Sequence, residues 1–399
     1  MNIEKTQWTK RFDFSMLSAW LITGLALAVI ALVQYGKDFR GYYAATRVLM
    51  AGGNPYDYDL VAQVLLQVTG EMGNNPYYYP PWFLWIFTPV SGLPFQVARA
   101  TWMLFNFVVW NLVLWQLRQM MGWPKTGWRS YALFITATCS FAWITWKYEQ
   151  VGILIFGMTI GLIRCIQQKR VTASGILMAL LLIKPNITLL VIAGVSLWLL
   201  RRGQGQTILV MILTLVVLLF VSTWITPGWF QPFSKEGFGQ GLTAVLDGPD
   251  NVVALRINTT LLSWLGAMGL DRRYHTPIYG ISLLLGILVF FWAVYRSQSF
   301  VQLISILLLV SFALTPYALQ YDYAPLVIVL FWALSLCASS PKALSVALLL
   351  TGFIFSVIFW QQNIAWGFWI VLGLVALASW GMYQKNQHDP VLDSVQQPL

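Results

Sequence analysis

Acidic residues are the side chains of this sequence best suited to chemistry. The chain has 14 Asp and Glu residues against two histidines and three cysteines. Neither histidine, His275 or His388, has a recognisable partner, and each cysteine lies in a long apolar run with no partner at metal-ligand spacing. A carboxylate that meets a hydroxyl group can accept its proton as a general base. The carboxylates therefore indicate where a reaction could occur, and their positions depend on the elements that carry them.

The composition of the chain is that of a membrane protein. Of its 399 residues, 58% are hydrophobic and only 10% are charged, and the mean hydropathy is +0.68. Soluble domains contain roughly 25% charged residues. The 24 Lys and Arg residues give a formal net charge of +10, which in a soluble protein would suggest a nucleic-acid partner. Membrane proteins collect Lys and Arg in their cytoplasmic loops, so we expect no nucleic-acid partner here.

Long apolar runs fill most of the chain and predict an all-α integral membrane protein with about twelve transmembrane helices, because a helix needs about 20 apolar residues to cross a bilayer. The first run, Ser15 to Gln34, is longer than a signal-peptide core and is interpreted as an uncleaved span. The other candidates are residues 96–117, 130–146, 150–166, 171–184, 186–200, 206–225, 277–295, 300–315, 323–339, 343–360 and 364–383. We expect residues 1–399 to form a single transmembrane domain without a separate soluble one.

The loop charges predict which side of the membrane each connection faces. If the first span leads outward, most Lys and Arg residues of the short loops face the cytoplasm, as the positive-inside rule requires. Both termini are then cytoplasmic, and two long outer segments cover about 35–95 and 226–276.

Most of the carboxylates then lie on the outer side of the membrane. They are Asp38, Asp57, Asp59, Glu71, Glu149, Glu236, Asp247, Asp250, Asp271 and Asp322. None of the acidic residues is expected near the bilayer midplane, where ion-coupled transporters usually keep their proton or ion relays. The distribution favours chemistry or recognition at the outer face over secondary transport.

The first outer segment predicts a short helix that begins at Asp38. Asp38 stands where an N-cap belongs, and Gly52-Gly53 stand where a helix should stop. On such a helix Asp38 and Tyr42 share one face, while Phe39, Tyr43 and Arg47 share the adjacent face. We expect an amphipathic helix at the outer membrane interface.

A second interfacial helix is expected from Trp82 to Val90. It follows the proline-rich stretch Tyr79-Pro80-Pro81, is too short to span the membrane, and is closed by Pro94. Two interfacial helices with a polar loop would suit a site where a lipid head group meets a second substrate. An ordinary packed cap over the helical bundle fits the composition equally well.

Ordered motifs of this chain resemble glycosyltransferase family 87. The first outer loop supplies Asp38-Phe39 with Tyr42-Tyr43-Ala44-Ala45, the turn Gly52-Gly53-Asn54-Pro55-Tyr56-Asp57, and Tyr79-Pro80-Pro81. Later pieces follow in the same order: Glu149-Gln150, Lys184-Pro185-Asn186, Asn258-Thr259-Thr260-Leu261, Thr315-Pro316-Tyr317 and Tyr321-Asp322-Tyr323. The resemblance covers residues 38 to about 330. This chain departs from some relatives in carrying Tyr321-Asp322-Tyr323 instead of a Trp-Asp-His sequence, and Lys147-Tyr148-Glu149 instead of a small polar run before Gln150.

The resemblance implies a GT-C type membrane enzyme with a defined reaction. Such an enzyme takes a hexose, here expected to be mannose, from a polyprenyl-phosphate carrier and adds it with inversion to a lipid-linked or periplasmic glycan at the outer face of the membrane. The implied partners are this donor, the glycan acceptor and membrane lipids, and the implied location is a bacterial inner membrane. No cofactor and no metal are expected, because enzymes of this type generally work without them.

The resemblance also assigns roles to residues that match its motifs. Asp38 is the expected base for the acceptor hydroxyl, with a helix N-cap as the alternative. Cations must meet the charge that develops on the leaving lipid phosphate, and the candidates are Lys184, Arg256, Lys147, Arg47 and Arg40. Lys184 follows an apolar run and needs an anionic partner, which could be the phosphate, Glu149 or another carboxylate.

The remaining candidates are expected to contact the sugar or the acceptor. They are Tyr42, Tyr43, Asn54, Tyr56, Tyr79, Glu149, Gln150, Asn186, Asn258, Tyr321 and Asp322. For Glu149 and Asp322, pairing with a nearby Lys or Arg fits equally well. Asp57 and Asp59 stand two residues apart in a Tyr-rich turn and are interpreted as loop charges rather than as a divalent-cation site.

Two other functions remain open on the sequence. A flippase or permease for lipid-linked glycans would have the same composition but predicts a polar pathway through the centre of the bundle. Charges within the spans are scarce, Lys184 being the main exception, and there is no pair of broken helices at the midplane. A glycan polymerase or ligase would also act on lipid-linked sugars outside the membrane.

Overall fold

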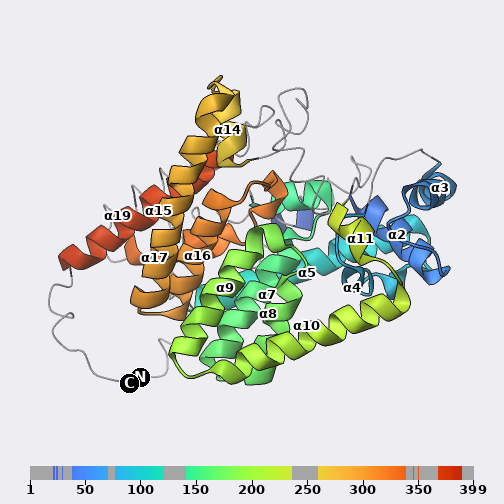
Figure 1. Ribbon diagram of the computed structural model, residues 1–399, viewed down its shortest axis with the longest axis horizontal. Coiled ribbons are helices and arrows are strands. Elements are labelled where there is room, and N and C mark those ends of the chain that lie inside the picture. Colours follow the sequence, from blue (N-terminus) through green and yellow to red (C-terminus); the bar gives the residue numbers. More distant parts are fainter. Residues whose placement is uncertain are drawn as a thin grey trace.

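The structure, a computed structural model, describes residues 38–70, 77–120, 141–235, 259–337 and 367–388, together with single positions in 21–29 and 345–349. Within these residues the regular secondary structure is helical, and no strand occurs there (Figure 1). The predicted all-α class is thereby confirmed for the described part of the chain.

Three helices of the described chain are long and apolar enough to cross a membrane: α5 (Phe95–Met120), α10 (Gly205–Ile225) and α15 (His275–Arg296). Six shorter apolar helices are α7 (Gly152–Gln167), α8 (Val171–Leu181), α9 (Pro185–Arg201), α16 (Phe300–Leu314), α17 (Leu326–Cys337) and α19 (Phe368–His388). They lie where apolar runs were predicted. The predicted spans 15–34 and 343–360 fall outside the described residues except at single positions, as does most of 130–146, of which 141–146 are helical. The number of about twelve spans therefore stays a prediction.

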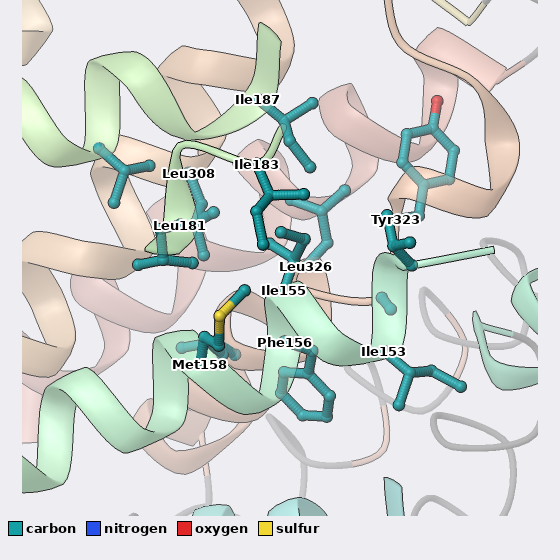
Figure 2. Packing of buried hydrophobic residues seen from close by; sticks show 14 of the residues in the cluster. Ile153, Ile155, Phe156, Met158, Leu181, Ile183, Ile187, Leu308, Tyr323 and Leu326 are labelled. Atoms are coloured by element: carbon teal, nitrogen blue, oxygen red, sulfur yellow. The ribbon is translucent and has the colours of Figure 1, made fainter. Parts of the chain in front are cut away.

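The core of the bundle forms around α16. This helix packs against α9, α15 and α17, and it is buried almost all round. Figure 2 shows part of this core, where Ile155 of α7 faces Leu326 of α17 and Ile183, while Phe156 points to the other side of α7. By contrast, α10 and α15 lie at the outside and expose apolar side chains along most of their length. A helix that is apolar all round and exposed suits a lipid environment.

Helix α2 (Phe39–Met50) begins directly after Asp38, as predicted. It ends at the expected glycines, where Gly52 adopts a φ of +78°, a conformation that glycine reaches without steric cost. The position of α2 at the outer membrane interface stays a prediction. The helix is buried on almost every side, and only Arg47 and Met50 are exposed. Its aromatic side chains explain the burial, since the Tyr42 ring lies 5.3 Å from that of Phe83.

The helix predicted from Trp82 to Val90 is broken. The structure has a single turn, α4 (Pro81–Leu84), and a separate short 3₁₀ helix, η1 (Thr88–Val90). Pro89 lies within the predicted helix and has no N–H with which to continue a helical ladder. The intervening turns are closed by hydrogen bonds between residues three apart, such as Phe87 N to Leu84 O at 2.9 Å.

Helix α3 (Tyr58–Thr69) was not predicted. It begins at Asp57, whose carboxylate accepts hydrogen bonds from the backbone N–H groups of Asp59 and Leu60 at 3.0 and 3.1 Å. It ends at Gly70, which has a φ of +72°. Asp57 therefore works as an N-cap and Asp59 lies in the first helical turn, where negative charge is favoured.

The other short elements described are α11 (Phe230–Pro232), α14 (Leu261–Ala267), η3 (Arg272–Tyr274) and η4 (Gln320–Asp322). Helices α2, α3, α4 and α11 gather at one end of the molecule, at the right of Figure 1.

The segment around η4 is anchored to neighbouring helices by side chains and by close packing. Thr145, in the helical segment 141–148, donates from its hydroxyl to the Tyr321 carbonyl at 3.1 Å. Asn186, at the start of α9, donates to the Tyr317 carbonyl at 2.8 Å. Gly152, at the start of α7, lies so close to the Tyr321 carbonyl oxygen that a Cβ atom would collide with it.

Gly152→Ala is expected to destabilise the protein by about 1–3 kcal/mol, because the added methyl group overpacks a contact with backbone that cannot swing away. Gly92→Ala is the matched control, since a Cβ atom there meets nothing within 4 Å. The midpoints of thermal unfolding in detergent would measure both. A Gly152→Ala protein as stable as Gly92→Ala would contradict the described packing of η4 on α7.

Candidate active site

Asp38 and Gln150 join the first outer loop to the start of α7. The Gln150 side-chain amide donates from Nε2 to Asp38 Oδ2 at 2.5 Å. Gln150 is buried, whereas Asp38 is half-buried. Asp38 occupies the N-cap position of α2, yet its side chain makes no capping hydrogen bond there. The carboxylate is therefore directed to Gln150 and not to the end of its own helix.

Two tyrosine hydroxyls hold the other end of the Gln150 amide. Tyr42 and Tyr79 donate to Gln150 Oε1 at 3.0 and 2.9 Å. Burial raises the pKa of both phenols above the ordinary tyrosine value, so both hydroxyls keep their protons and act as donors. The prediction that Asp38 and Tyr42 share one face of α2 is confirmed, because both side chains reach Gln150.

Lys184 forms a buried ion pair with Asp322, a carboxylate with no solvent exposure. The predicted anionic partner of Lys184 is thus a carboxylate, although it is not Glu149. The Lys184 ammonium also lies 3.5 Å from the Tyr79 hydroxyl and 4.9 Å from the centre of the Tyr321 ring. The second oxygen of Asp322 accepts from the Leu319 N–H at 3.0 Å. A buried ion pair needs such additional hydrogen bonds to offset the loss of hydration.

Glu149 pairs with Arg99, a residue near the start of α5 that the sequence analysis missed. Arg99 Nε lies 2.5 Å from Glu149 Oε1, and both side chains are buried. The other oxygen, Oε2, is buried without a hydrogen-bond donor among the described residues. Burial raises the pKa of Glu149 to about 7, although the charge of Arg99 opposes that shift. Arg99 is a cation within an apolar run, and the reasoning applied to Lys184 would have identified it.

The contacts above join six side chains in one polar cluster: Asp38, Tyr42, Tyr79, Gln150, Lys184 and Asp322. Several other predicted site residues support this polar cluster from outside. Tyr56 donates to the Tyr79 carbonyl at 2.6 Å, and its own N–H is held by Asn54 at 3.0 Å. Asn186 anchors the segment before η4. These side chains position the Tyr79 and Tyr321 segments and are engaged in that role.

Two predicted residues lie apart from the cluster, on the adjacent face of α2. Tyr43 donates to the Leu93 carbonyl at 2.6 Å, and Arg47 donates to the Tyr43 hydroxyl at 3.0 Å.

The other predicted cation in the described residues is Lys147. It is half-buried, with its amine 5.7 Å from the centre of the Tyr148 ring, which packs on Tyr321. Arg256 and Asn258 lie outside the described residues.

The helix ends that lie around the cluster are N-terminal ends. Asp38, Val151 and Lys184 are the N-cap residues of α2, α7 and α9. Arg99 is the fifth residue of α5, and Asp322 lies four residues before the start of α17. Five helices therefore begin at or near the same polar cluster. The N-terminal end of a helix carries partial positive charge, so this arrangement favours a bound anion.

Removal of one partner of the Lys184–Asp322 pair should destabilise the protein by about 3–5 kcal/mol, because it leaves an uncompensated buried charge. Lys184→Met and Asp322→Asn test each side, and the double variant removes both charges. We expect the double variant to lose less than the sum of the two single losses, measured as free energies or midpoints of unfolding. Purely additive losses would show that the two side chains do not interact.

The raised pKa of Glu149 makes stability depend on pH in a defined direction. A glutamate in the unfolded chain titrates near pH 4.3, so between about pH 4.5 and 7 the folded protein binds more protons than the unfolded one. The contribution of Glu149 to stability is complete below this window and is lost as the pH rises through it, by up to about 3 kcal/mol.

Glu149→Gln should accordingly flatten the decline in the unfolding midpoint between pH 5 and 7.5, whatever its effect on stability at a single pH. Asp271→Asn removes an exposed carboxylate and serves as the control. An unchanged slope in Glu149→Gln would contradict a pKa near 7 for this carboxyl group.

Comparison with known proteins agrees with the family that the motifs resemble. The family model of glycosyltransferase family 87 matches residues 77–316, which is more than half of the chain. No curated protein matches the chain. The matched segment includes Tyr79, Gln150 and Lys184 of the polar cluster, while Asp322 lies shortly after it and Asp38 well before it. The chain belongs to glycosyltransferase family 87 and is a membrane glycosyltransferase.

Proposed function

We propose that this enzyme transfers a hexose, with mannose the expected sugar, from a polyprenyl-phosphate donor to a hydroxyl group of a lipid-linked or periplasmic glycan. The anomeric configuration would be inverted. The observation that carries the proposal is the half-buried Asp38, held by Gln150 at the end of the bundle where five helix N-termini converge. A carboxylate beside a region that favours anions suits a reaction between a hydroxyl group and a sugar phosphate.

Asp38 would act as the general base. Its carboxylate would accept the proton of the acceptor hydroxyl as the oxygen attacks the anomeric carbon, and the bond from that carbon to the phosphate oxygen would break. The electron pair of the broken bond leaves with the lipid phosphate. Inversion requires the attacking oxygen and the phosphate to lie on opposite faces of the sugar, as in inverting glycoside hydrolysis.

The donor phosphate would be met by the helix N-termini and by cations near the cluster. Lys184 was a leading candidate, but its charge is neutralised by Asp322, so we assign it first to holding the η4 segment in place. Lys147 is half-buried, with its amine beside the Tyr148 ring, and is proposed as a phosphate contact, as is Arg256. Arg47 is engaged by Tyr43 on the other face of α2 and is a weaker candidate.

The sugar and the acceptor would be bound by the half-buried aromatic residues next to Asp38. Tyr79, Tyr148 and Tyr321 are half-buried and lie within electrostatic range of the Asp38 carboxylate. Their rings can pack on the apolar face of a sugar and their hydroxyls can bond to its oxygens. Tyr42 and Gln150 would contribute through Asp38, because both are buried.

The whole chain is proposed to work as one transmembrane domain of GT-C type in a bacterial inner membrane. Both termini would be cytoplasmic, and the Asp38 end of the bundle would face outward. The one-sided distribution of Lys and Arg in the short loops supports this orientation.

Transfer of radiolabelled mannose from synthetic polyprenyl-phosphate-mannose by the purified protein, with bacterial membrane lipids as acceptors, tests the proposed reaction. We expect labelled glycolipid from the wild type and a loss of about 10²- to 10⁴-fold in rate for Asp38→Asn, since a general base contributes about that much. Asp59→Asn removes an exposed carboxylate from the same loop and should keep full activity.

Full activity of Asp38→Asn would exclude Asp38 as the base. Transfer from a polyprenyl-diphosphate oligosaccharide in place of the monophosphate donor would identify a glycan ligase or polymerase. Movement of intact glycolipid across vesicles without a new glycosidic bond would identify a flippase and overturn the proposal.

A further inference from the structure

We propose that Gln150 is a positioning residue that orients the Asp38 carboxylate and holds it ready to accept a proton, and that Tyr42, Tyr79 and Lys184 fix the direction of the Gln150 amide. This inference rests on the proposed role of Asp38. It adds a function for Gln150 that differs from contact with the sugar.

The donors of this network all point towards Asp38. The Lys184 ammonium lies 3.5 Å from the Tyr79 hydroxyl, which donates to Gln150 Oε1 at 2.9 Å. Tyr42 donates to the same oxygen at 3.0 Å. Gln150 Nε2 then donates to Asp38 Oδ2 at 2.5 Å. Each bond polarises the next, and a chain that begins at a cation and ends at a carboxylate stabilises the ionised carboxylate.

The amide can take only one of its two orientations here. A Gln150 side chain turned by 180° would place its oxygen against Asp38 Oδ2, so that two acceptors would face each other. It would also leave the protons of two buried hydroxyls without their present acceptor. The two tyrosines therefore ensure that an N–H, and not a carbonyl oxygen, faces the Asp38 carboxylate.

The backbone around Gln150 is held in an unusual conformation. Glu149 has a φ of +56°, which is rare for a residue with a Cβ atom. Three hydrogen bonds enforce it: Trp102 Nε1 donates to the Glu149 carbonyl at 3.0 Å, Glu149 N donates to Trp146 O at 3.0 Å, and Gln150 N donates to Thr145 O at 3.0 Å. Such strain persists where the surrounding structure fixes it, and here it places the Gln150 side chain against Asp38.

Other ionisable groups also act on Asp38 and must be accounted for in a test. The groups within electrostatic range include Tyr42 on its own helix, Tyr79, Tyr148 and Tyr321 from other segments, and the Glu149 carboxylate. The Arg40 guanidinium, two residues from Asp38, acts on Glu149 and belongs to the same environment. Burial raises the pKa of Glu149 to about 7, so its charge changes within the range of interest. Each variant is therefore also compared in a Glu149→Gln background.

The test measures protonation of Asp38 without using activity. A water-soluble carbodiimide with an amine nucleophile couples to protonated carboxyl groups, and peptide mass spectrometry of the detergent-solubilised protein gives the extent of coupling at Asp38 across pH 3–8. Gln150→Ala should move the midpoint of coupling up by about one to two pH units, because a hydrogen bond to the charged form is lost. Gln150→Glu, which keeps the shape of the side chain, should move it at least as far.

Two further variants separate the network from simple damage. The double variant Tyr42→Phe and Tyr79→Phe leaves Gln150 in place and should move the midpoint in the same direction by a smaller amount, because the amide loses both fixing donors. Gln116→Ala removes a half-buried glutamine that accepts from Arg164 at 2.9 Å, far along α5 from Asp38, and should leave the midpoint unchanged.

In the transfer reaction, the acid limb of the pH profile of kcat/KM should move up by the same amount as the coupling midpoint in each variant. Unchanged coupling midpoints in both Gln150 variants would overturn the inference, and the proposed reaction would still stand if Asp38→Asn is inactive. Shifted midpoints in a protein that accepts no polyprenyl-phosphate donor would support the inference and exclude the proposed donor. A shift of equal size in Gln116→Ala would also overturn it.

Discussion

The cost of burying charge in an apolar bundle is the constraint on which this site depends. Lys184, Asp322, Arg99 and Glu149 are all buried where the loops meet, and each is tied to a partner of opposite charge. An unpaired charge there would cost several kcal/mol, so each pair fixes the relative positions of the segments that carry it. Lys184 with Asp322 ties the start of α9 to the segment before α17. Arg99 with Glu149 ties the start of α5 to the turn before α7.

The neutral side chains of Tyr79 and Gln150 connect Lys184 to the half-buried Asp38, and Tyr42 supports the Gln150 amide. The buried ion pairs and the half-buried Asp38 therefore have different roles. The fully buried charges are neutralised and hold the loops in place. The Asp38 carboxylate, which keeps access to solvent, is held by the uncharged amide of Gln150. Because several helices begin at or near this cluster, their N-terminal ends favour negative charge there.

The sequence predicted which residues belong to the site better than it predicted which of them contact one another. The apolar runs located nine described helices, and the cap and stop residues located α2, because these signals act over a few neighbouring residues. The need of Lys184 for an anion followed from the cost of burial, but the choice of Asp322 over Glu149 depends on contacts between segments more than 100 residues apart. The break in the predicted helix 82–90 follows from Pro89, whose position in the sequence already disfavours a continuous helix. The hydrogen bond from Gln150 to Asp38 could not be predicted, because it depends on the left-handed turn at Glu149.

The central claim is that Asp38 removes the proton of an acceptor hydroxyl at the sugar of a polyprenyl-phosphate donor. The most direct test is a cryo-electron microscopy structure of the Asp38→Asn protein with polyprenyl-phosphate-mannose bound. The account predicts that the anomeric carbon lies beside residue 38, with this side chain on the face of the sugar opposite to the phosphate and with space for a hydroxyl group between them. A sugar bound away from residue 38, or a phosphate on the same face as this side chain, would contradict it.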